Sequence, residues 1–361
     1  MKVYLIANEA SGDLHAAEVM KAIKAKVSTV EFRFWGGDKM KEVGGEQIQH
    51  YKSLSVMGLD VLKRLPEIFN KIKFVINDIL AFQPDVVVLI DSPAFNMRVA
   101  KAIKKKGIKV CYYIAPKVWA WREGRVHKLK KIVDKLCCIL PFEEDYFLDF
   151  GLDASFVGNP SAQQIDQFQK INPTEKEDFI ALLPGSRAKE IERLLPTMLQ
   201  VSKNFPKEQF VIVGAPAFNR KDYPVTLPSN VSIRFDNSFN ILAKSKAALV
   251  TSGTATLETA LFEVPQVVLY KANKLTVFMG RMLIKIKFIS LVNIIMNKTV
   301  VKELIQSECN SETIGRELDL ILNDNLYKSR MLKDYKELKA SLMKSLASEE
   351  VATIAINLAK K

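Results

Sequence analysis

Two turns in the second half of the sequence carry residue types that suit phosphate binding. In the first, Pro184-Gly-Ser-Arg187 follows the apolar run Phe179–Leu183. Gly185 lets the backbone approach a ligand closely, Ser186 can cap a helix, and the guanidinium of Arg187 can pair with two phosphate oxygens. The pattern predicts a strand, a tight turn and a helix whose N-terminus faces an anion.

The second turn follows the apolar run Ala248–Val250 and repeats this logic. Its backbone N–H groups and hydroxyls come from Ser252, Gly253, Thr254, Ala255 and Thr256. Glu258, in the first helical turn, can accept hydrogen bonds from ribose hydroxyls. Together the turns predict a diphosphate cradle at the carboxyl edge of a sheet; two ordinary capped helices are the alternative. Neither turn is a Walker loop or a G-x-G-x-x-G fingerprint, so ATP or NAD binding is not predicted.

Carboxylates follow two apolar runs in the first half. The turn after Val3–Ala7 supplies side chains that could hold a sugar hydroxyl, namely Glu9, Ser11, Gly12 and Asp13. Asp91 ends the run Val86–Ile90, where a carboxylate facing a cleft can act as a general base. Each has a structural alternative. Ser11 or Asp13 can cap the next helix, Glu9 can be buried in its own hydrogen bonds, and Asp91 can be a cap or turn residue.

Short apolar runs alternate with helical patterns along the whole chain, whose 361 residues suit two domains. Continuous apolar runs are expected of strands covered on both faces, and alternation with helices makes the sheets parallel. The fold class is therefore α/β, with two doubly wound sheets built from Val3–Ala7, Val86–Ile90, Val110–Ala115 and Leu136–Leu140, then from Phe179–Leu183, Phe210–Val213, Ala248–Val250 and Val267–Tyr270.

The polar stretch 162–178 separates the two series and is interpreted as a linker. We expect an N-terminal domain over 1–165, a second domain over 175–335, and a C-terminal helix over 336–361.

Composition limits the other chemistry. The four cysteines lack C-x-x-C spacing and the three histidines lack partners at metal-ligand spacing, so we expect buried free thiols and no metal site. No run of about eighteen apolar residues is free of charge, and the chain opens on a strand pattern instead of a signal peptide. We therefore expect a cytoplasmic protein without a spanning helix.

The formal net charge is +13, and the basic residues are clustered. Thirteen basic and two acidic residues lie between Arg98 and Lys135, and the stretch 271–287 has five basic residues and no acid. Such blocks indicate an anionic partner: nucleic acid, phospholipid head groups or a phosphorylated substrate. A solvated basic surface is the alternative.

Two segments, 61–80 and 275–295, combine basic residues with a helical apolar pattern. A basic amphipathic helix can lie in a membrane interface; packing on a sheet is the alternative. The predicted membrane contacts in the first segment are Val61, Leu62, Leu65, Ile68, Phe69 and Ile72.

The motifs together resemble the lipid-A-disaccharide synthase family, inverting glycosyltransferases of the two-domain GT-B type. The resemblance runs in order along nearly the whole chain, through Glu9-Ala-Ser-Gly-Asp13, Gly36-Gly37 with Met40, Asp91-Ser-Pro-Ala-Phe-Asn96, Pro116-Lys-Val-Trp-Ala-Trp-Arg122 with Arg125, Pro141-Phe-Glu143, Val157-Gly-Asn-Pro160, Leu183-Pro-Gly-Ser-Arg187, Ser252-Gly-Thr-Ala-Thr-Leu-Glu258 and Ser290-Leu-Val-Asn293.

The resemblance implies a reaction. Family members transfer 2,3-diacylglucosamine from its UDP derivative to the 6-hydroxyl of 2,3-diacylglucosamine 1-phosphate. The products are UDP and a β-1,6 disaccharide 1-phosphate, and no metal is expected at the diphosphate. Because both substrates are acylated, the resemblance implies peripheral attachment to the cytoplasmic face of the inner membrane. The last helix is implied to cross back to the first domain or to exchange between subunits of a homodimer.

The resemblance also assigns roles. Asp91 becomes the general base, with Glu9 as the second catalytic carboxylate. Arg187 and the turn 252–256 stabilise leaving UDP, Glu258 holds the ribose, and Asn293 lies near the donor. The acceptor side is implied to be lined by Glu9, Ser11, Gly12, Asp13, Asn96, Trp121, Arg122 and Arg125.

Four positions depart from the family pattern: Asn8, Asn159, Val292 and Lys298. They put the substrates in doubt more than the reaction class. Another enzyme of this fold acting on a soluble UDP-sugar, such as an epimerase or a peptidoglycan-precursor transferase, is one alternative. A basic nucleic-acid-binding protein is the other, although no nucleic-acid module is recognisable.

Overall fold

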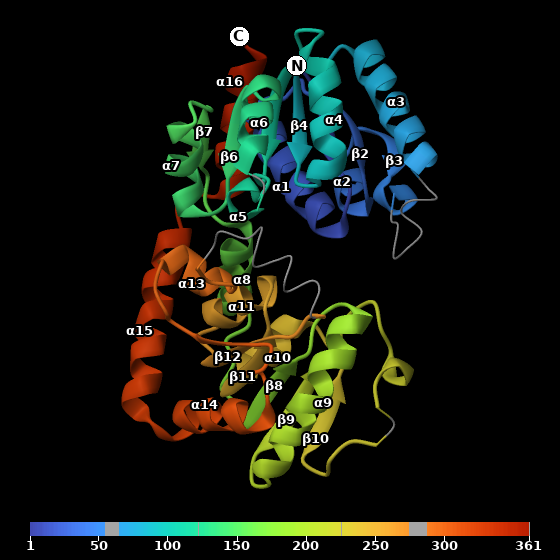
Figure 1. Ribbon diagram of the computed structural model, residues 1–361. Helices are drawn as coiled ribbons and strands as arrows, with labels where there is room; N and C mark the ends of the chain where they lie inside the picture. Colours follow the sequence, from blue (N-terminus) through green and yellow to red (C-terminus); the bar gives the residue numbers. More distant parts are fainter. Residues whose placement is uncertain (55–64, 122, 225, 274–286, 361) are drawn as a thin grey trace. The chain divides into compact units, whose positions relative to one another are not determined.

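The computed structural model describes residues 1–54, 65–121, 123–224, 226–273 and 287–360 (Figure 1). The chain divides into two compact units. Unit 1 comprises Met1–Pro160 together with Leu342–Lys361, and unit 2 comprises Ser161–Ser341.

Unit 1 is built on a parallel sheet with the strand order β3-β2-β1-β4-β5-β6-β7. The chain turns from one half of the sheet to the other between β1 and β4, and ligands of such sheets bind at the carboxyl ends of strands beside this switch point. The strands are β1 (Lys2–Ala7), β2 (Glu31–Gly36), β3 (Glu46–His50), β4 (Val86–Ile90), β5 (Lys109–Tyr113), β6 (Lys135–Cys138) and β7 (Ala154–Phe156).

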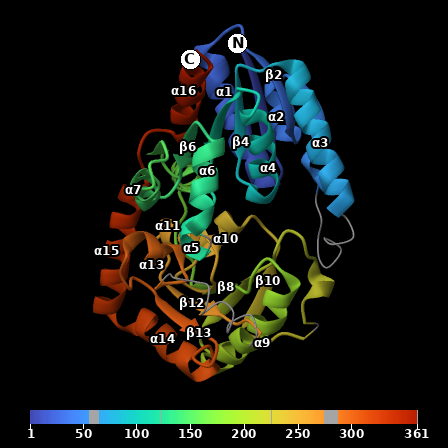
Figure 2. The same ribbon diagram turned by 45° about the horizontal axis from the view of Figure 1, so that its top comes forward.

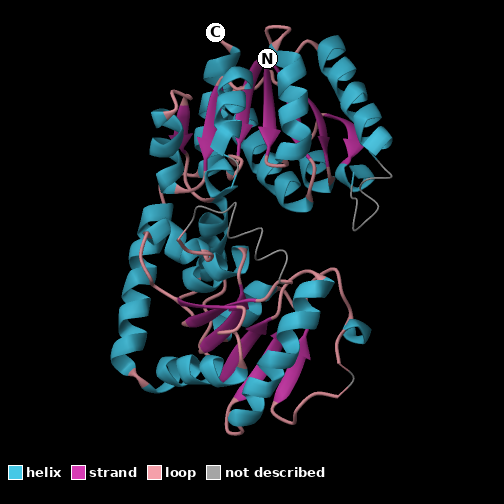
Figure 3. Cartoon of the chain, viewed as in Figure 1, coloured by secondary structure: helices cyan, strands magenta, loops and turns pink. Residues whose placement is uncertain are grey.

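Both faces of this sheet are covered, as Figure 3 shows. Successive β1 side chains alternate between two apolar clusters: Tyr4 and Ile6 join one, and Val3 and Leu5 join the other. The first cluster includes α3 (Leu65–Phe82), α4 (Pro93–Lys104), α6 (Val126–Ile132) and α7 (Pro141–Asp149). The second includes α1 (Ala10–Lys26) and α16 (Ala347–Ala359), which contact each other (Figure 2), together with Met40 of α2 (Asp38–Val43). A short helix, α5 (Val118–Trp121), and the single turns η1 (Tyr51–Leu54) and η3 (Glu123–Arg125) complete the described part of unit 1.

Unit 2 repeats the architecture with the order β10-β9-β8-β11-β12-β13. Its strands are β8 (Phe179–Leu183), β9 (Gln209–Val213), β10 (Val231–Arg234), β11 (Ala247–Thr251), β12 (Gln266–Tyr270) and β13 (Lys302–Ile305). Its helices are α8 (Pro160–Ile171), α9 (Ala188–Asn204), α10 (Ser238–Lys244), α11 (Thr254–Leu261), α13 (Leu291–Met296), α14 (Ser311–Asn323) and α15 (Asn325–Leu342), with the turn η4 (Arg220–Asp222).

The predicted fold class, two doubly wound parallel sheets, is confirmed, and all eight apolar runs form strands. Two local expectations differ from the structure. The stretch 162–178, interpreted as a linker, lies mostly within α8. The C-terminal segment expected as one helix is divided between α15 and α16. At this break the Leu342 carbonyl accepts a hydrogen bond from Asn159 N, and the Lys344 ammonium donates to the Phe156 carbonyl.

Candidate active site

The carboxyl edge of the unit 1 sheet has unusual backbone geometry. Asp91 (φ 47°) and Ser92 (φ 43°) follow β4, and Ile114 (φ 66°) follows β5; all three lie in the left-handed region. This conformation is rare for residues other than glycine, and it is least favourable for a β-branched side chain. Such strain persists only where surrounding contacts fix the chain, and it gathers at functional sites.

The backbone of Asp91 is held from two sides. Its N–H donates to the Tyr113 carbonyl at 2.9 Å. Its own carbonyl accepts from the Tyr112 hydroxyl at 2.6 Å and from Asn96 Nδ2 at 2.9 Å. Both Tyr112 and Asn96 are fully buried, so Asp91 sits on a rigid support.

Burial raises the pKa of Asp91, while a hydrogen bond from the Ser92 backbone and the charge of Lys117 act in the opposite direction. Glu9 follows β1, across the switch point from β4. Partial desolvation, and then the negative charge of Asp91, raise the pKa of Glu9. The charge of Asp91 therefore acts on a second predicted carboxylate at the position where a general base is expected.

In the predicted turn after β1, the carboxylate of Asp13 has a structural role. Asp13 is 3% exposed, and its carboxylate accepts hydrogen bonds from the backbone of Gly37 (2.6 Å), Lys39 (3.0 Å) and Met40 (3.2 Å). It therefore satisfies the N-terminus of α2, and it is not directed at a ligand. Ser11 is exposed and Gly12 is buried.

The other predicted acceptor residues have different surroundings. Asn96 is fully buried and donates to the carbonyls of Ile90 and Asp91, so it supports the candidate base from behind. Arg125 is half-buried at the end of η3. Arg122 and the side chain of Trp121 lie outside the described residues.

Lys117 and Glu143 were not predicted as site residues. Lys117 lies in the turn after β5, and its charge opposes the rise that burial causes in the pKa of both Asp91 and Glu143. Glu143 is 1% exposed and accepts a hydrogen bond from Trp119 Nε1 at 3.0 Å. The sequence signal for Glu143 was the motif Pro141-Phe-Glu143, which gave no role to the carboxylate.

In unit 2 the first phosphate turn already contains an anion. Gly185 adopts φ +119°, and a Cβ there would lie 2.5 Å from Glu190 Oε2. The Glu190 carboxylate accepts from Ser186 N at 3.1 Å and from Arg187 Nη1 at 2.8 Å. The Arg187 side chain is still 81% exposed, which leaves other N–H donors of its guanidinium facing solvent. A glutamate three positions into a helix is a common cap, and this spacing could have identified Glu190.

The second turn offers backbone groups more than hydroxyls. Ser252 Oγ donates to the Ile289 carbonyl at 2.9 Å, and Thr256 Oγ1 donates to the Gly253 carbonyl at 2.8 Å. Gly253 and Thr254 are exposed and Ala255 is half-buried at the start of α11. Within the described part of the chain, the N–H groups of these last three residues have no hydrogen-bond acceptor.

Glu258 is a half-buried carboxylate on α11. Burial raises its pKa, and it has no hydrogen bond or ion pair with any described residue. A carboxylate in this state is suited to accept hydrogen bonds from a ligand's hydroxyls.

Asn293 has a different role from the predicted donor contact. It is fully buried. Its Oδ1 accepts from Val300 N (2.8 Å) and Val301 N (3.0 Å), and its Nδ2 donates to the Val301 carbonyl and to Glu303, both at 2.9 Å. These bonds use the capacity of the amide, so Asn293 holds the segment after α13 in place. Lys298, one of the departures from the family pattern, pairs with Asp334 at 2.6 Å.

Some of the predicted membrane contacts are buried or half-buried, one is exposed, and the side chains of the others lie outside the described residues. Val61 and Leu62 lie outside the described residues, as does the side chain of Leu65. Ile72 is 6% exposed and Ile68 packs against the same core, so both belong to the protein interior, because this face of α3 covers the sheet. Phe69 is 54% exposed, and Phe74, which was not predicted, is 50% exposed. Of the second segment, residues 274–286 lie outside the described residues.

Other expectations concern what the molecule contains. All four cysteines are buried free thiols, as predicted. Within the described ranges, no helix is long and apolar enough to cross a membrane. The same ranges contain no cluster of three or more His, Cys, Asp or Glu side chains able to hold a metal ion.

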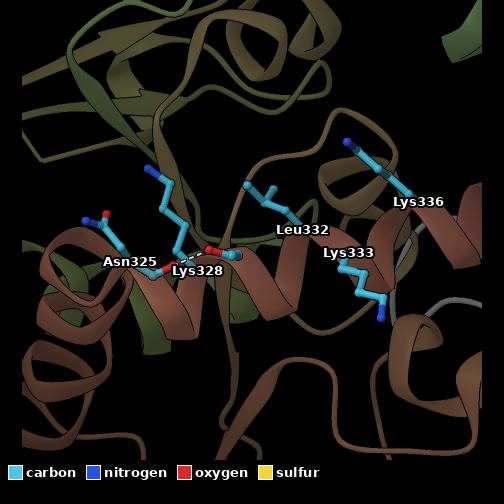
Figure 4. Close-up of a pocket in the computed structure, with 6 residues that line it drawn as sticks. Asn325, Lys328, Leu332, Lys333 and Lys336 are labelled. Atoms are coloured by element: carbon cyan, nitrogen blue, oxygen red, sulfur yellow. Dashed lines mark hydrogen bonds between the residues drawn. The ribbon is translucent and has the colours of Figure 1, made fainter.

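A cavity of about 530 Å³ lies along α15 and contains none of the predicted site residues. Figure 4 shows the lysines along this helix, with Lys328 and Lys336 on one side and Lys333 directed to the other. The lining comprises Asn325, Lys328, Ser329, Leu332, Lys333 and Lys336.

Comparison with solved structures places the fold. The glycotransferase of kitacinnamycin matches with a TM-score of 0.66 at 13% identity, covering 99% of this chain and 98% of that one. A UDP-GlcNAc 2-epimerase from Neisseria meningitidis bound to UDP-GlcNAc matches with a TM-score of 0.65 at 14% identity, covering 100% of both chains. These likenesses confirm the GT-B architecture.

Sequence comparison is more specific. The model of the family described as lipid-A-disaccharide synthetase matches residues 3–355. A lipid-A-disaccharide synthase of Myxococcus xanthus (strain DK1622) is 34% identical over 99% of this chain and 97% of its own length. Another, of Syntrophus aciditrophicus (strain SB), is 37% identical over 99% of this chain and 98% of its own length. The chain is therefore a glycosyltransferase of lipid A biosynthesis and belongs to the lipid-A-disaccharide synthetase family.

Proposed function

We propose that this enzyme transfers 2,3-diacylglucosamine from UDP-2,3-diacylglucosamine to the 6-hydroxyl of 2,3-diacylglucosamine 1-phosphate. The products are a β-1,6 disaccharide 1-phosphate and UDP. The observation that most directly supports this reaction is the desolvated Asp91 carboxylate on its fixed backbone, next to Glu9. It provides a base where an acceptor hydroxyl must lose its proton.

In the proposed chemical step, Asp91 removes the proton from the 6-hydroxyl as that oxygen attacks the anomeric carbon of the donor. The bond between this carbon and the UDP oxygen breaks on the opposite face, and its electron pair leaves with UDP. The configuration at the anomeric carbon is thereby inverted. Glu9, whose pKa is raised by the negative charge of Asp91 as well as by desolvation, is proposed as the second catalytic carboxylate.

Unit 2 supplies the groups for the leaving diphosphate. The exposed guanidinium of Arg187 and the N–H groups of Gly253, Thr254 and Ala255 can stabilise the negative charge that develops on UDP. Glu258 is proposed to accept hydrogen bonds from the ribose hydroxyls. We further propose that these groups make a resident metal unnecessary.

The test is an assay of detergent-solubilised protein with both acylated substrates, in the presence of EDTA. Product and UDP are followed by mass spectrometry, and wild type is compared with Asp91→Asn. Disaccharide from wild type and a loss of about a hundredfold or more in the variant are expected. Equal rates would remove Asp91 from the role of base, and no product from folded wild type with varied acyl lengths would refute the substrates.

We also propose that the enzyme attaches peripherally to the cytoplasmic face of the inner membrane through α3. The exposed rings of Phe69 and Phe74 are accompanied by the exposed Lys73 and Arg98, and the Arg98 guanidinium lies 5.7 Å from the centre of the Phe69 ring. Apolar rings beside cations suit an interface of anionic lipids.

Flotation with vesicles tests this attachment. Phe69→Ser/Phe74→Ser should reduce binding to vesicles that contain anionic lipid by about tenfold or more, because two apolar anchors are lost. Phe235→Ser, which removes an exposed ring (43%) from unit 2, is the matched control and should bind normally. Unchanged binding of the α3 double variant would refute this docking surface.

A further inference from the structure

The turn after β5 is strained and lies beside the candidate base. It begins at Ile114, whose φ of 66° costs a β-branched residue about 1–3 kcal/mol. The turn continues through Lys117, which is exposed and forms no ion pair with a described residue, although its charge acts on Asp91 and on Glu143. The position of Lys117 therefore influences the base, and other contacts must hold this turn.

Glu143 provides those contacts from the start of α7. Its Oε1 accepts from the indole N–H of Trp119 at 3.0 Å, and its Oε2 accepts from the backbone N–H groups of Leu140 (3.1 Å) and Ile139 (3.3 Å). The Trp119 ring also packs edge-on against Phe142, with 5.0 Å between ring centres. An ionised carboxylate is tolerated in the interior only with such partners, so these hydrogen bonds join the ionised form of Glu143 to Trp119 and to the start of α7.

Three neighbouring segments place titratable or hydrogen-bonding groups around Glu143. These groups are Lys117 and Trp119 from the turn after β5, the Cys138 thiol from β6, and the backbone N–H groups before α7. Burial raises the pKa of Glu143 to about 7, against the opposing effects of these hydrogen bonds and of Lys117. Its charge therefore changes within the pH range in which enzymes are assayed.

We propose that Glu143 is a positioning residue of the transfer reaction: its carboxylate fixes Trp119, and with it the Lys117 ammonium, beside the Asp91 carboxylate. The kinetic part of this proposal rests on the proposed role of Asp91. When Glu143 is protonated, Trp119 loses an anionic acceptor and the turn that carries Lys117 is less firmly held.

The first test observes the network without any substrate. In protein labelled with ¹⁵N-tryptophan, the Trp119 indole N–H resonance, assigned by its absence in Trp119→Phe, should shift with a midpoint near pH 7. Glu143→Gln should abolish this shift, whereas Glu144→Gln, which alters the adjacent carboxylate, should retain it. A Trp119 resonance that does not titrate in wild type would overturn the proposal, whether or not the variants fold.

The second test is kinetic. Glu143→Gln and Trp119→Phe should each lower kcat by about tenfold or more, with the KM for the UDP-sugar unchanged. The wild-type profile of kcat against pH should contain a step near pH 7 that Glu143→Gln lacks and Glu144→Gln keeps. A step that persists in Glu143→Gln, or a rise in donor KM as the only effect, would overturn the positioning role. Inactive wild type with a normal indole titration would instead count against the proposed substrates alone.

Discussion

At the scale of single residues, two buried carboxylates and one half-buried carboxylate distinguish this site from its surroundings. Asp13, Glu143 and Asp91 all follow strands of one sheet, yet their partners differ. The Asp13 carboxylate accepts from three backbone N–H groups at the N-terminus of α2, and the Glu143 carboxylate accepts from an indole and two backbone N–H groups. The Asp91 carboxylate has the fewest hydrogen-bond donors of the three, so it is the most available to accept a proton from a substrate hydroxyl.

The pH dependence of stability should report the charge of Glu143 directly. Its pKa is raised from 4.5 to about 7 in the folded protein, so the folded state keeps a proton that the unfolded state releases. Stability is therefore fully present below pH 4.5 and falls as pH rises through about 7, by on the order of 3 kcal/mol. Glu143→Gln does not titrate, so the stability of wild type relative to this variant should fall over that window.

This prediction can be measured by urea denaturation at several pH values. All three tryptophans (Trp35, Trp119, Trp121) belong to unit 1, so fluorescence follows the unit that contains Glu143. A stability difference between wild type and Glu143→Gln that is independent of pH would show that Glu143 is already ionised throughout the range. Glu144→Gln again serves as the control and should track wild type.

Substitutions at two glycines of unit 2 should distinguish an effect on UDP binding from an effect on folding. A Cβ on Gly253 meets open space and φ is extended, so Gly253→Ala should leave the melting temperature nearly unchanged. If the diphosphate approaches this backbone, the methyl group should weaken UDP binding by about tenfold or more. Gly185→Ala should instead destabilise the fold by about 1–3 kcal/mol, because φ is +119° and Glu190 occupies the space. Calorimetric titration with UDP and thermal melts distinguish the two, and normal UDP affinity in Gly253→Ala would exclude a close backbone contact.

At the scale of elements, the sequence predicted strands that have a continuous apolar run. Those runs reflect burial on both faces, as in β4 and β11, where every residue is buried. The strands that were not predicted lack a continuous apolar run. β3 (Glu-Gln-Ile-Gln-His) has no fully buried residue, and β7 is short. Such strands form because a neighbouring strand supplies hydrogen bonds and a packing surface, which no local pattern encodes.

The same distinction applies to the site. The roles of the candidate residues stay predictions, but Glu9, Asp91 and Arg187 could be singled out from the sequence because each lies between a strand and the next helix, and Glu258 because it lies in α11, which follows β11. The network of Glu143 with Trp119 could not, since it joins residues that come together only when β5 and β6 pair. Asn293 was given a ligand-binding role from the resemblance and Asp13 from its place in the turn after the first strand, and their internal hydrogen bonds become visible only in the folded chain.

At the scale of the whole molecule, unit 1 is assembled from both ends of the chain. Its C-terminal helix α16 buries Val351, Ala352 and Ala355 against the face of the sheet covered by α1. The turn that carries Glu9 begins this same helix α1. The last residues of the chain therefore support one side of the candidate active site, although they carry none of its side chains.

Removing the chain after Leu342 should consequently destabilise unit 1 and spare unit 2. The sheet face covered by α16 would be exposed, at a cost of several kcal/mol for the buried side chains of this helix. Tryptophan fluorescence should then show unit 1 unfolding at lower urea, whereas UDP binding, which we assign to unit 2, should be retained. Val351→Asp should reproduce this loss within the full chain, because it places a charge in the same core. Lys360→Ala, on the exposed end of the segment, should behave as wild type. A truncated protein with unchanged unit 1 stability would mean that α16 only rests on the sheet, and that Glu9 and Asp91 are positioned without it.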